Sequence, residues 1–363
     1  MKKNKFRWLV STALLSSLML AACGGGESDD GGGDTDNGES AEGNGETYEW
    51  RFVTEENDGQ VQYEYAEEFA NRLEEKSDGQ ITMDVYEFGG LGSEVDQVEQ
   101  LQSGAVEFAI VSPGFTGTMV EEGQIFALQF LLPDDQEVTH ELLNTSEALN
   151  DDLAALYEEN NIKPLSFWTE GAMQWTGNSE LTEPADFEGF KMRTQDSPLI
   201  QESYKAYGAD PSVMSWGELY SGLQTGTVDG QENPIFFIAD ASFHEVQDYM
   251  TISNHNTYVA MTTVNPSFYD GLPDDIKGII DETVEEMRDV GFELQDDLNN
   301  ELLSEIEDNE ENPTEVTELT EDQRDAFREL AIPQRDFYRE NAGDQAGEIL
   351  DKLESEIEEI QGE

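Results

Sequence analysis

Strands and helices alternate regularly after residue 47, and this alternation restricts the folds open to the chain more than any other feature. Apolar residues at a period of two or at helical spacing predict strand, helix, strand, helix and strand at 48–54, 61–73, 81–85, 93–104 and 106–111. Ser93 and Asp96 form a capping box at the start of the second helix, and Gly104 ends it. This order predicts an α/β fold with a largely parallel sheet and right-handed crossovers.

The elements that follow predict a second lobe. The chain crosses into it near Trp168–Gly171, and a later strand returns to the first lobe. We expect, in order, a helix, a strand, a short helix, a strand, a helix and the returning strand at 139–160, 162–167, 184–187, 190–193, 198–208 and 252–262. After Pro273, helical spacing of apolar residues continues for about thirty residues, which at 1.5 Å per residue spans ~45 Å, enough to lie across two lobes. A coiled-coil helix is the alternative for this segment. Further acidic amphipathic helices are predicted at 321–362.

The stretch 215–236 contains the densest set of local signals. Ser215 and Glu218 have capping-box spacing, so a helix is predicted to begin at Trp216, and Gly226 ends it. Thr227–Val228 suit a short buried strand.

Two residues of this stretch are candidates for a ligand wall. Pro234 keeps Asn233 extended, so a polar amide is held at a strand end, one helix after the indole of Trp216. The alternative is a core tryptophan and a loop asparagine.

The charge of the chain excludes some partners. Lysine and arginine total 18, aspartate and glutamate total 82, and the formal net charge is −64, spread along the whole chain. Such a surface excludes nucleic acid as a partner and is repelled by an anionic bilayer. It stays hydrated in high salt, where screening removes self-repulsion, so we predict a salt-rich or alkaline exterior habitat.

The N-terminus predicts a lipoprotein. A basic segment precedes a short apolar run at 8–20 and the lipobox Leu20-Ala21-Ala22-Cys23. We expect 1–22 to be a cleaved signal peptide, Cys23 to carry lipid, and 23–47 to form a flexible acidic, glycine-rich tether. Cys23 is the single cysteine, so no internal disulfide is possible. The folded part would then lie outside the cytoplasm, anchored to the outer face of the membrane or in the periplasm.

No catalytic or metal-binding motif occurs. The sequence has no P-loop, no G-x-S-x-G and no H-E-x-x-H, and the three histidines (His140, His244 and His255) are scattered. We read His140 and His244 as surface residues. We expect a protein that is not an enzyme and that needs no metal ion or cofactor.

Polar and aromatic side chains at strand ends remain as candidates for a ligand site. In open α/β sheets ligands bind beyond the carboxyl ends of the strands. Arginine is scarce here, and the guanidinium of Arg193 could hold a carboxylate in two-pronged fashion, although a surface ion pair is the alternative. The candidate residues are Glu56, Phe115, Arg193, Trp216, Asn233, Phe237 and Tyr258.

Three motifs resemble the substrate-binding proteins of tripartite ATP-independent (TRAP) transporters, the DctP-like family. They are Lys191-Met192-Arg193, the run Leu223–Pro234 (L-Q-T-G-T-V-D-G-Q-E-N-P) and Gly89–Ser93. The resemblance covers nearly all of 48–350 and implies a two-lobed periplasmic-binding-protein-like fold. In that fold the ligand lies in a cleft between hinged lobes, and a long helix braces both lobes.

The resemblance also implies how the chain is divided and what it works with. We expect lobe 1 to comprise 48–170 and 261–296, and lobe 2 to comprise 171–260 and 297–363. The implied partners are a small solute and TRAP-type permease subunits in the membrane, and we expect a monomer.

Within that family the chain is similar to the members that bind ectoine or 5-hydroxyectoine. The similarity lies in Ser112–Gly117, Trp216–Glu218 and Asn233–Phe236. It implies that Glu56, with Glu55 as a one-residue alternative, contacts the cyclic amidinium. Further implied roles are a carboxylate grip for Arg193, aromatic walls for Phe115 and Trp216, and a polar contact for Asn233.

Two departures from that pattern bear on the solute. Phe237 stands where a tryptophan is usual, and Tyr258 stands where a phenylalanine is usual. The segment Gly171-Ala172-Met173 lacks the second arginine of many dicarboxylate-binding members, which argues against dianions. The alternatives are a binding protein for another monocarboxylate or a C4-dicarboxylate, or a sensory ligand-binding module.

Overall fold

The computed structural model describes residues 47–310 and 313–362. The predicted signal peptide, Cys23 and nearly all of the tether lie outside these residues. Within them, no helix combines the length and the apolar character needed to cross a membrane.

The first lobe is built on a five-stranded mixed sheet in the order β2-β1-β3-β10-β4. Its strands are β1 (Tyr48–Val53), β2 (Ile81–Tyr86), β3 (Phe108–Val111), β4 (Lys163–Ala172) and β10 (Thr257–Val264). β1 pairs in parallel with β2 and β3, as expected, but β10 pairs antiparallel with β3 and β4. The largely parallel sheet is therefore correct only for β1, β2 and β3. β4 runs toward the second lobe and β10 returns from it, so these neighbours have opposite directions.

The second lobe is built on a four-stranded sheet in the order β11-β9-β5-β8. Its strands are β5 (Gln174–Gly177), β8 (Gly230–Asn233), β9 (Tyr249–Ile252) and β11 (Glu315–Glu318). A separate parallel pair joins β6 (Arg193–Thr194) to β7 (Ser212–Val213), so the strand expected at 190–193 is shorter and later than predicted.

The chain passes between the two sheets at β4–β5 and again at β9–β10. The two crossings are joined, because the Met173 N–H donates to the Asn256 carbonyl at 2.8 Å. The single returning strand expected at 252–262 is wrong. Asn254 has a φ of 44°, which breaks the extended chain into β9 in one sheet and β10 in the other.

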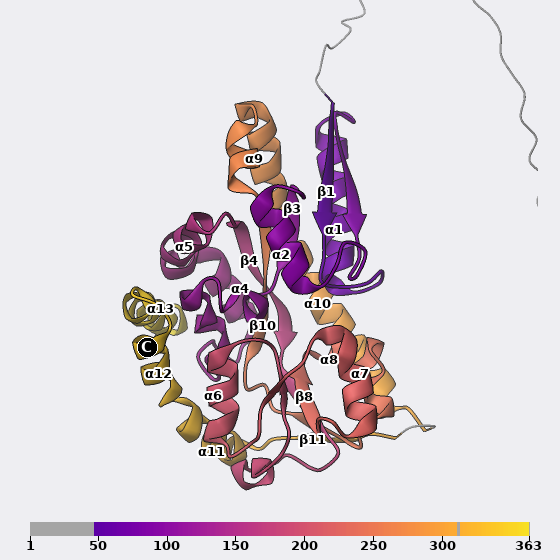
Figure 1. The fold of residues 1–363 in the computed structure, drawn as a ribbon, viewed down its shortest axis with the longest axis vertical. Coiled ribbons are helices and arrows are strands. Elements are labelled where there is room, and N and C mark those ends of the chain that lie inside the picture. The colour runs from indigo at the N-terminus through magenta and orange to yellow at the C-terminus, as the bar shows by residue number, and fades with distance from the viewer. Residues whose placement is uncertain (1–46, 311–312, 363) are drawn as a thin grey trace, which may run out of the picture. The chain divides into compact units, whose positions relative to one another are not determined.

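The long helix α10 (Asp274–Glu307, 34 residues) lies across both lobes, as predicted. It packs against α1 (Val61–Lys76) and β4 in the first lobe and against α8 (Ile235–Asp240) in the second, as can be followed in Figure 1. Gly291 allows close approach, since a Cβ there would lie 3.3 Å from Tyr65 and 3.4 Å from Trp168. α10 is thus the brace that the α/β two-lobed fold requires.

The remaining helices cover the two sheets. They are α2 (Glu94–Ser103), α3 (Pro113–Thr116), α4 (Gln136–Thr145), α5 (Ala154–Glu159), α6 (Pro198–Ala206), α7 (Trp216–Thr225), α9 (Pro266–Gly271), α11 (Glu321–Ala331), α12 (Gln334–Asn341) and α13 (Ala346–Gln361). Short 3-10 segments lie at Glu121–Ala127, Pro184–Phe187 and Phe243–Glu245. The capping box of Ser93 and Asp96 is confirmed at α2.

One predicted helix is interrupted. The segment expected to be one helix at 139–160 consists of α4, a π-helical turn (Ala148–Leu153) and α5. The cause is a contact from a distant helix, because the Glu356 carboxylate of α13 accepts the backbone N–H groups of Glu147 and Ala148 at 3.1 and 3.2 Å. Those bonds begin a new helical segment after Ser146.

The C-terminal helices contact both parts of the molecule. α11 and α12 pack against α6, beside which Figure 1 shows them. α13 packs instead against α4 and the π-helical turn. Like α10, the last helices therefore touch elements of both lobes.

Candidate functional site

A cavity lies where the two lobes meet. The first lobe contributes the loop after β1, the start of α2 and the helix α3. The second lobe contributes the ends of β6 and β8 and the starts of α7 and α8. Its lining residues are Glu55, Glu94, Phe115, Arg193, Gln195, Trp216, Asn233, Phe237 and Tyr258. Six of the seven candidate residues line this one cavity, and Glu56 is the exception.

Arg193 is a buried cation that lacks a full set of partners. Its side chain is 2 % exposed, and its Nε donates to the Met214 carbonyl at 3.0 Å. Its Nη2 is buried without a hydrogen-bond partner, and Arg193 forms no ion pair with any described residue. The alternative of a surface ion pair is therefore wrong. Burial lowers the pKa of Arg193, against the opposing influence of Tyr258, Glu94 and Glu232.

A buried guanidinium of this kind is costly unless an anion meets it. The free Nη2 belongs to a side chain that lines the cavity, so a carboxylate in the cavity could accept from it. Anion recognition is thus the chemistry that Arg193 offers.

Aromatic rings form much of the wall. The rings of Trp216 and Phe237 lie 5.0 Å apart at 63°, and those of Phe237 and Tyr258 lie 5.7 Å apart at 57°. Phe115 faces them from the first lobe, on α3. Such faces attract a delocalised cation through the negative face of the ring.

Glu55, not Glu56, lines the cavity. Its carboxylate accepts the Ser112 N–H at 3.1 Å and also the Ser112 hydroxyl. Burial raises the pKa of Glu55 to about 8. The two residues lie in the bend that follows β1, and their carboxylates accept from different partners, Ser112 and the Gln62 N–H.

Glu56 is buried elsewhere. Its Oε2 accepts the Gln62 N–H at 2.7 Å, and its Oε1 is buried without a hydrogen-bond partner. Burial and the nearby Glu170 carboxylate raise its pKa well above the usual value. Burial also raises the pKa of Glu170 to about 7. Like charges this close cannot both ionise readily, so the pair favours a shared proton.

The helix α7 places Trp216 as its first residue, as predicted, and Gly226 ends it with a φ of 68°. The expected capping box is wrong. The Ser215 hydroxyl donates to the Glu218 carboxylate at 3.0 Å and accepts no backbone N–H. Ser215 and Glu218 have the spacing of a capping box, but their side chains bond to each other and not to the backbone. Ser215 therefore does not cap the N-terminus of α7.

Asn233 ends β8, which lies later than the strand predicted at Thr227–Val228. The Thr227 N–H donates to the Gly222 carbonyl at 2.9 Å and so closes the C-terminal end of α7. Pairing with β5 begins only at Gly230, opposite Gly177, and brings Asn233 opposite Gln174. The extended conformation predicted for Asn233 is confirmed.

Two lining residues, Glu94 and Gln195, were absent from the sequence analysis. Glu94 is the first residue of α2 and is 3 % exposed, and burial raises its pKa while Arg193 opposes the shift. Gln195 follows β6 and contacts Gly114 across the cleft. With 82 acidic residues in the chain, nothing local marked Glu94 as different.

His255 is buried, unlike the other two histidines. Its Nε2 lies 2.7 Å from the Glu232 carboxylate, and its Nδ1 lies 2.7 Å from the Ser253 hydroxyl. Its ring stacks on Trp175 at 4.4 Å. Ser253 is fully buried and donates to the Met173 carbonyl, so this set ties the two interlobe crossings together.

The described residues contain no group of three or more His, Cys, Asp or Glu side chains that could hold a metal ion.

Comparison with known proteins places this geometry in a family. Residues 52–341 match the family described as bacterial extracellular solute-binding protein, family 7. The ectoine-binding periplasmic protein TeaA of Halomonas elongata is 35% identical over 355 residues, which are 98% of each chain. The ectoine/5-hydroxyectoine-binding periplasmic protein UehA of Ruegeria pomeroyi is 35% identical over 309 residues, 85% of this chain and 90% of that one.

A solved structure shares the fold. The periplasmic ectoine-binding protein of the TeaABC TRAP transporter of Halomonas elongata superposes with a TM-score of 0.82 at 36% identity, covering 86% of this chain and 99% of that one. The described fold is thus that of a known solute-binding protein.

Proposed function

This chain belongs to the bacterial extracellular solute-binding proteins of family 7, and we propose that its solute is ectoine or 5-hydroxyectoine. Proteins of this family bind small solutes for TRAP-type membrane permeases and are not catalysts. The observation that carries the proposal is the buried guanidinium of Arg193, which lines the cavity with its Nη2 unpaired.

A zwitterion with one carboxylate fits the charges of the cavity. Its carboxylate would accept from Arg193, and its cationic ring would lie among Trp216, Phe237 and Tyr258. Glu55 would pair with the cationic end and ionise as it does so, since a positive charge favours the carboxylate form. Glu56, the glutamate that the family resemblance indicates, remains a second candidate for this role.

A C4-dicarboxylate fits the same cavity less well. One of its carboxylates could bind Arg193, but the other would meet Glu55 or Glu94 in a buried setting. Among the described lining residues Arg193 is the single cationic side chain, so the second carboxylate would be buried without an ion-pair partner. Another monocarboxylate or small zwitterion is therefore the closer alternative, and a sensory module would use the same binding site.

We further propose that the lobes close on the solute and that the closed form docks on the permease. The crossings at Met173 and Ser253–Asn256 would serve as the hinge, because there a strand of one sheet leads directly to a strand of the other, whereas the third crossing runs along the helix α10. Lobe 1 would comprise 48–170 and 261–296, and lobe 2 would comprise 171–260 and 297–363.

The N-terminal features support a location outside the cytoplasm. The homologues TeaA and UehA are periplasmic proteins. We propose that Cys23 carries lipid after removal of 1–22, so that a monomer is tethered at the outer face of the membrane. The acidic composition supports a salt-adapted surface.

The test is a ligand panel. Ectoine, 5-hydroxyectoine, succinate and a 2-oxo acid are titrated into the purified protein and binding is followed by calorimetry. We expect ectoine or 5-hydroxyectoine to bind at least ten-fold more tightly than the other two. Preferential binding of succinate would overturn the proposed solute, and a genomic neighbour other than a TRAP permease would favour the sensory alternative.

A further inference from the structure

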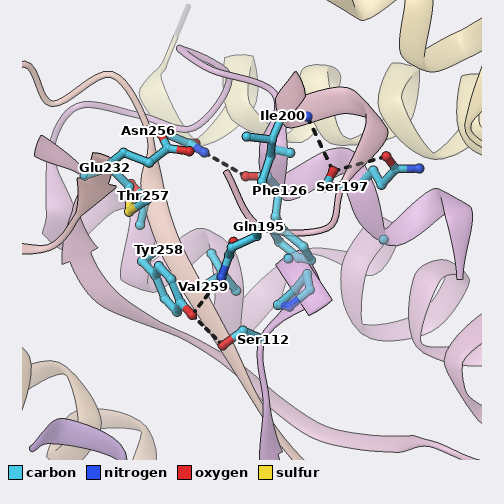
Figure 2. Close-up of a pocket in the computed structure, with 16 residues that line it drawn as sticks. Ser112, Phe126, Gln195, Ser197, Ile200, Glu232, Asn256, Thr257, Tyr258 and Val259 are labelled. Atoms are coloured by element: carbon cyan, nitrogen blue, oxygen red, sulfur yellow. Dashed lines mark hydrogen bonds between the residues drawn. The ribbon is translucent and has the colours of Figure 1, made fainter. Parts of the chain in front are cut away.

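A second cavity adjoins the one that Arg193 lines. It lies between the segment 112–127 of the first lobe and residues 195–200 of the second. Figure 2 shows its lining, with Glu232 and Asn256 on one side and Ser197 and Ile200 on the other. Gln195 and Tyr258 line both cavities, so these two side chains form the wall between them.

Hydrogen bonds hold this wall in place. The Gln195 Nε2 donates to the Tyr258 hydroxyl at 3.3 Å, and that hydroxyl donates to the Ser112 Oγ at 2.9 Å, as Figure 2 shows. The Ser112 hydroxyl in turn donates to Glu55. The chain of bonds therefore runs from the second lobe to the first, across the full width of the wall.

The first lobe leaves a fitted space for Gln195. A Cβ placed on Gly114 would lie 1.9 Å from the Gln195 Oε1 and 2.5 Å from its Cδ. Such distances are far shorter than a van der Waals contact, so only glycine at 114 admits the Gln195 side chain in this position. Tyr258 is carried by β10, between β3 and β4, whereas Gln195 lies in a loop. Of the two wall residues, Gln195 is thus the one carried by a loop, and its side chain closes the part of the wall that lies against Gly114.

The second cavity is polar along most of its lining. Its hydrogen-bonding side chains are Ser112, Gln124, Gln195, Ser197, Glu232, Asn256, Thr257 and Tyr258. The Asn256 Oδ1 is buried and has no hydrogen-bond partner, although its Nδ2 donates to the Phe126 carbonyl at 2.9 Å. An unpaired buried acceptor favours a hydroxyl donor. A chain of hydroxyl groups is therefore the chemistry that this lining would accept.

We propose that Gln195 sets the upper limit on solute length by separating the Arg193 cavity from this polar cavity. With Gln195 in place, only a compact carboxylate fits beside Arg193. With the side chain shortened, the cavities join, and a longer polyhydroxylated monocarboxylate can place its carboxylate on Arg193 and its hydroxyl groups toward Asn256. This inference rests on the proposed function, because it assumes that Arg193 holds the carboxylate.

The experiment measures a ratio of affinities. Ectoine and galactonate, a six-carbon polyhydroxylated monocarboxylate, are titrated by calorimetry into the wild type, Gln195→Ala and the control Gln201→Ala. Gln201 is a half-buried glutamine of the adjacent helix α6 that lines neither cavity. We expect Gln195→Ala to shift the ratio at least ten-fold toward galactonate and Gln201→Ala to leave it unchanged.

An unchanged ratio in a folded Gln195→Ala protein would overturn the inference, and so would a wild type that binds galactonate as tightly as ectoine. If Gln195→Ala fails to melt cooperatively, Gln195→Ser is measured against the same criteria. Failure of ectoine itself to bind counts against the proposed solute, and the ratio is then taken against the monocarboxylate or zwitterion that does bind. The two failures are thereby distinguished.

Discussion

The side-chain amide of Asn299 donates to the backbone carbonyl of Glu170 at 3.0 Å, which ties the long helix α10 to the end of β4. The Asn299 Oδ1 also accepts the Phe236 N–H at 3.1 Å, just beyond β8. One side chain on α10 therefore holds a backbone group in each lobe, close to where the chain changes sheets. Gly171 lies against it, since a Cβ there would be 2.6 Å from the Asn299 Nδ2.

Replacing Asn299 should destabilise the protein. Asn299→Ala leaves backbone groups of both lobes without their partners, and we expect the free energy of unfolding to fall by about 1–3 kcal/mol. Urea denaturation measures the change. The matched control is Asn300→Ala, because Asn300 is the next residue of α10 and is exposed. Equal stability of the two variants would show that the Asn299 contacts carry no net stabilisation.

The raised pKa of Glu55 predicts a dependence of stability on pH. Burial raises the pKa of Glu55 to about 8, above the usual value for glutamate, so the folded protein binds a proton that the unfolded chain releases as pH rises past 4.5. The stabilising effect of this proton is complete below pH 4.5 and is lost as pH rises through about 8.

Glu55→Gln removes that titration. We expect the free energy of unfolding of the wild type, relative to Glu55→Gln, to fall by at least about 1 kcal/mol between pH 5 and pH 8. Urea denaturation of both proteins at several pH values measures the difference. A constant difference across that range would contradict the raised pKa.

Trp216 should report solute binding. It is the tryptophan that lines the cavity among the residues that the structure describes, and it lies against Phe237 at 5.0 Å. We expect ectoine to change the intrinsic fluorescence of the wild type and of Trp50→Phe. The change should be lost in Trp216→Phe, which should also bind more weakly because one aromatic wall shrinks, by about 0.5–1.5 kcal/mol. An undiminished fluorescence change in Trp216→Phe would remove Trp216 from the site.

The acidic composition predicts that salt stabilises the fold. A formal net charge of −64 repels itself, and the Debye length shortens from roughly 30 Å at 0.01 M salt to roughly 10 Å at 0.1 M. We expect the melting temperature to rise steadily as NaCl increases over this range. A melting temperature that does not respond to NaCl would contradict a salt-adapted surface.

Local signals predicted single elements well and the path between them less well. Ser93 and Gly104 delimit α2 because each acts on its own helix end. A strand returning to the first lobe was predicted, but its antiparallel place between β3 and β4 depends on tertiary pairing, which no local pattern records. Two predicted elements were each too long for the same reason. The predicted strand 252–262 is broken at Asn254, and the predicted helix 139–160 is interrupted where Glu356 binds the backbone of Glu147. The apolar pattern is continuous through both segments and so does not predict either break.

The residues of the candidate site were likewise predicted where a local signal marked them and missed where tertiary contacts placed them. Arg193 was recognised because arginine is scarce in this chain, and Trp216 and Asn233 because a helix start and a strand end fix their places; all three line one cavity. Glu55 and Glu56 are neighbours in the bend after β1, and a family pattern does not record which of the two carboxylates reaches Ser112 and which reaches Gln62. Glu94 and Gln195 reach the cavity from the start of a helix and from a loop, where the sequence carried no signal.

The central claim is that Arg193 holds the carboxylate of a compact zwitterion, and calorimetric titration of ectoine into Arg193→Ala tests it most directly. Arg72→Ala is the control, because Arg72 forms ion pairs with Glu68 and Glu286 far along α1 and does not line the cavity. We expect Arg193→Ala to lose more than about 2 kcal/mol of binding free energy, roughly thirty-fold in Kd, and Arg72→Ala to bind as the wild type does. Wild-type affinity for ectoine in a folded Arg193→Ala protein would contradict the account.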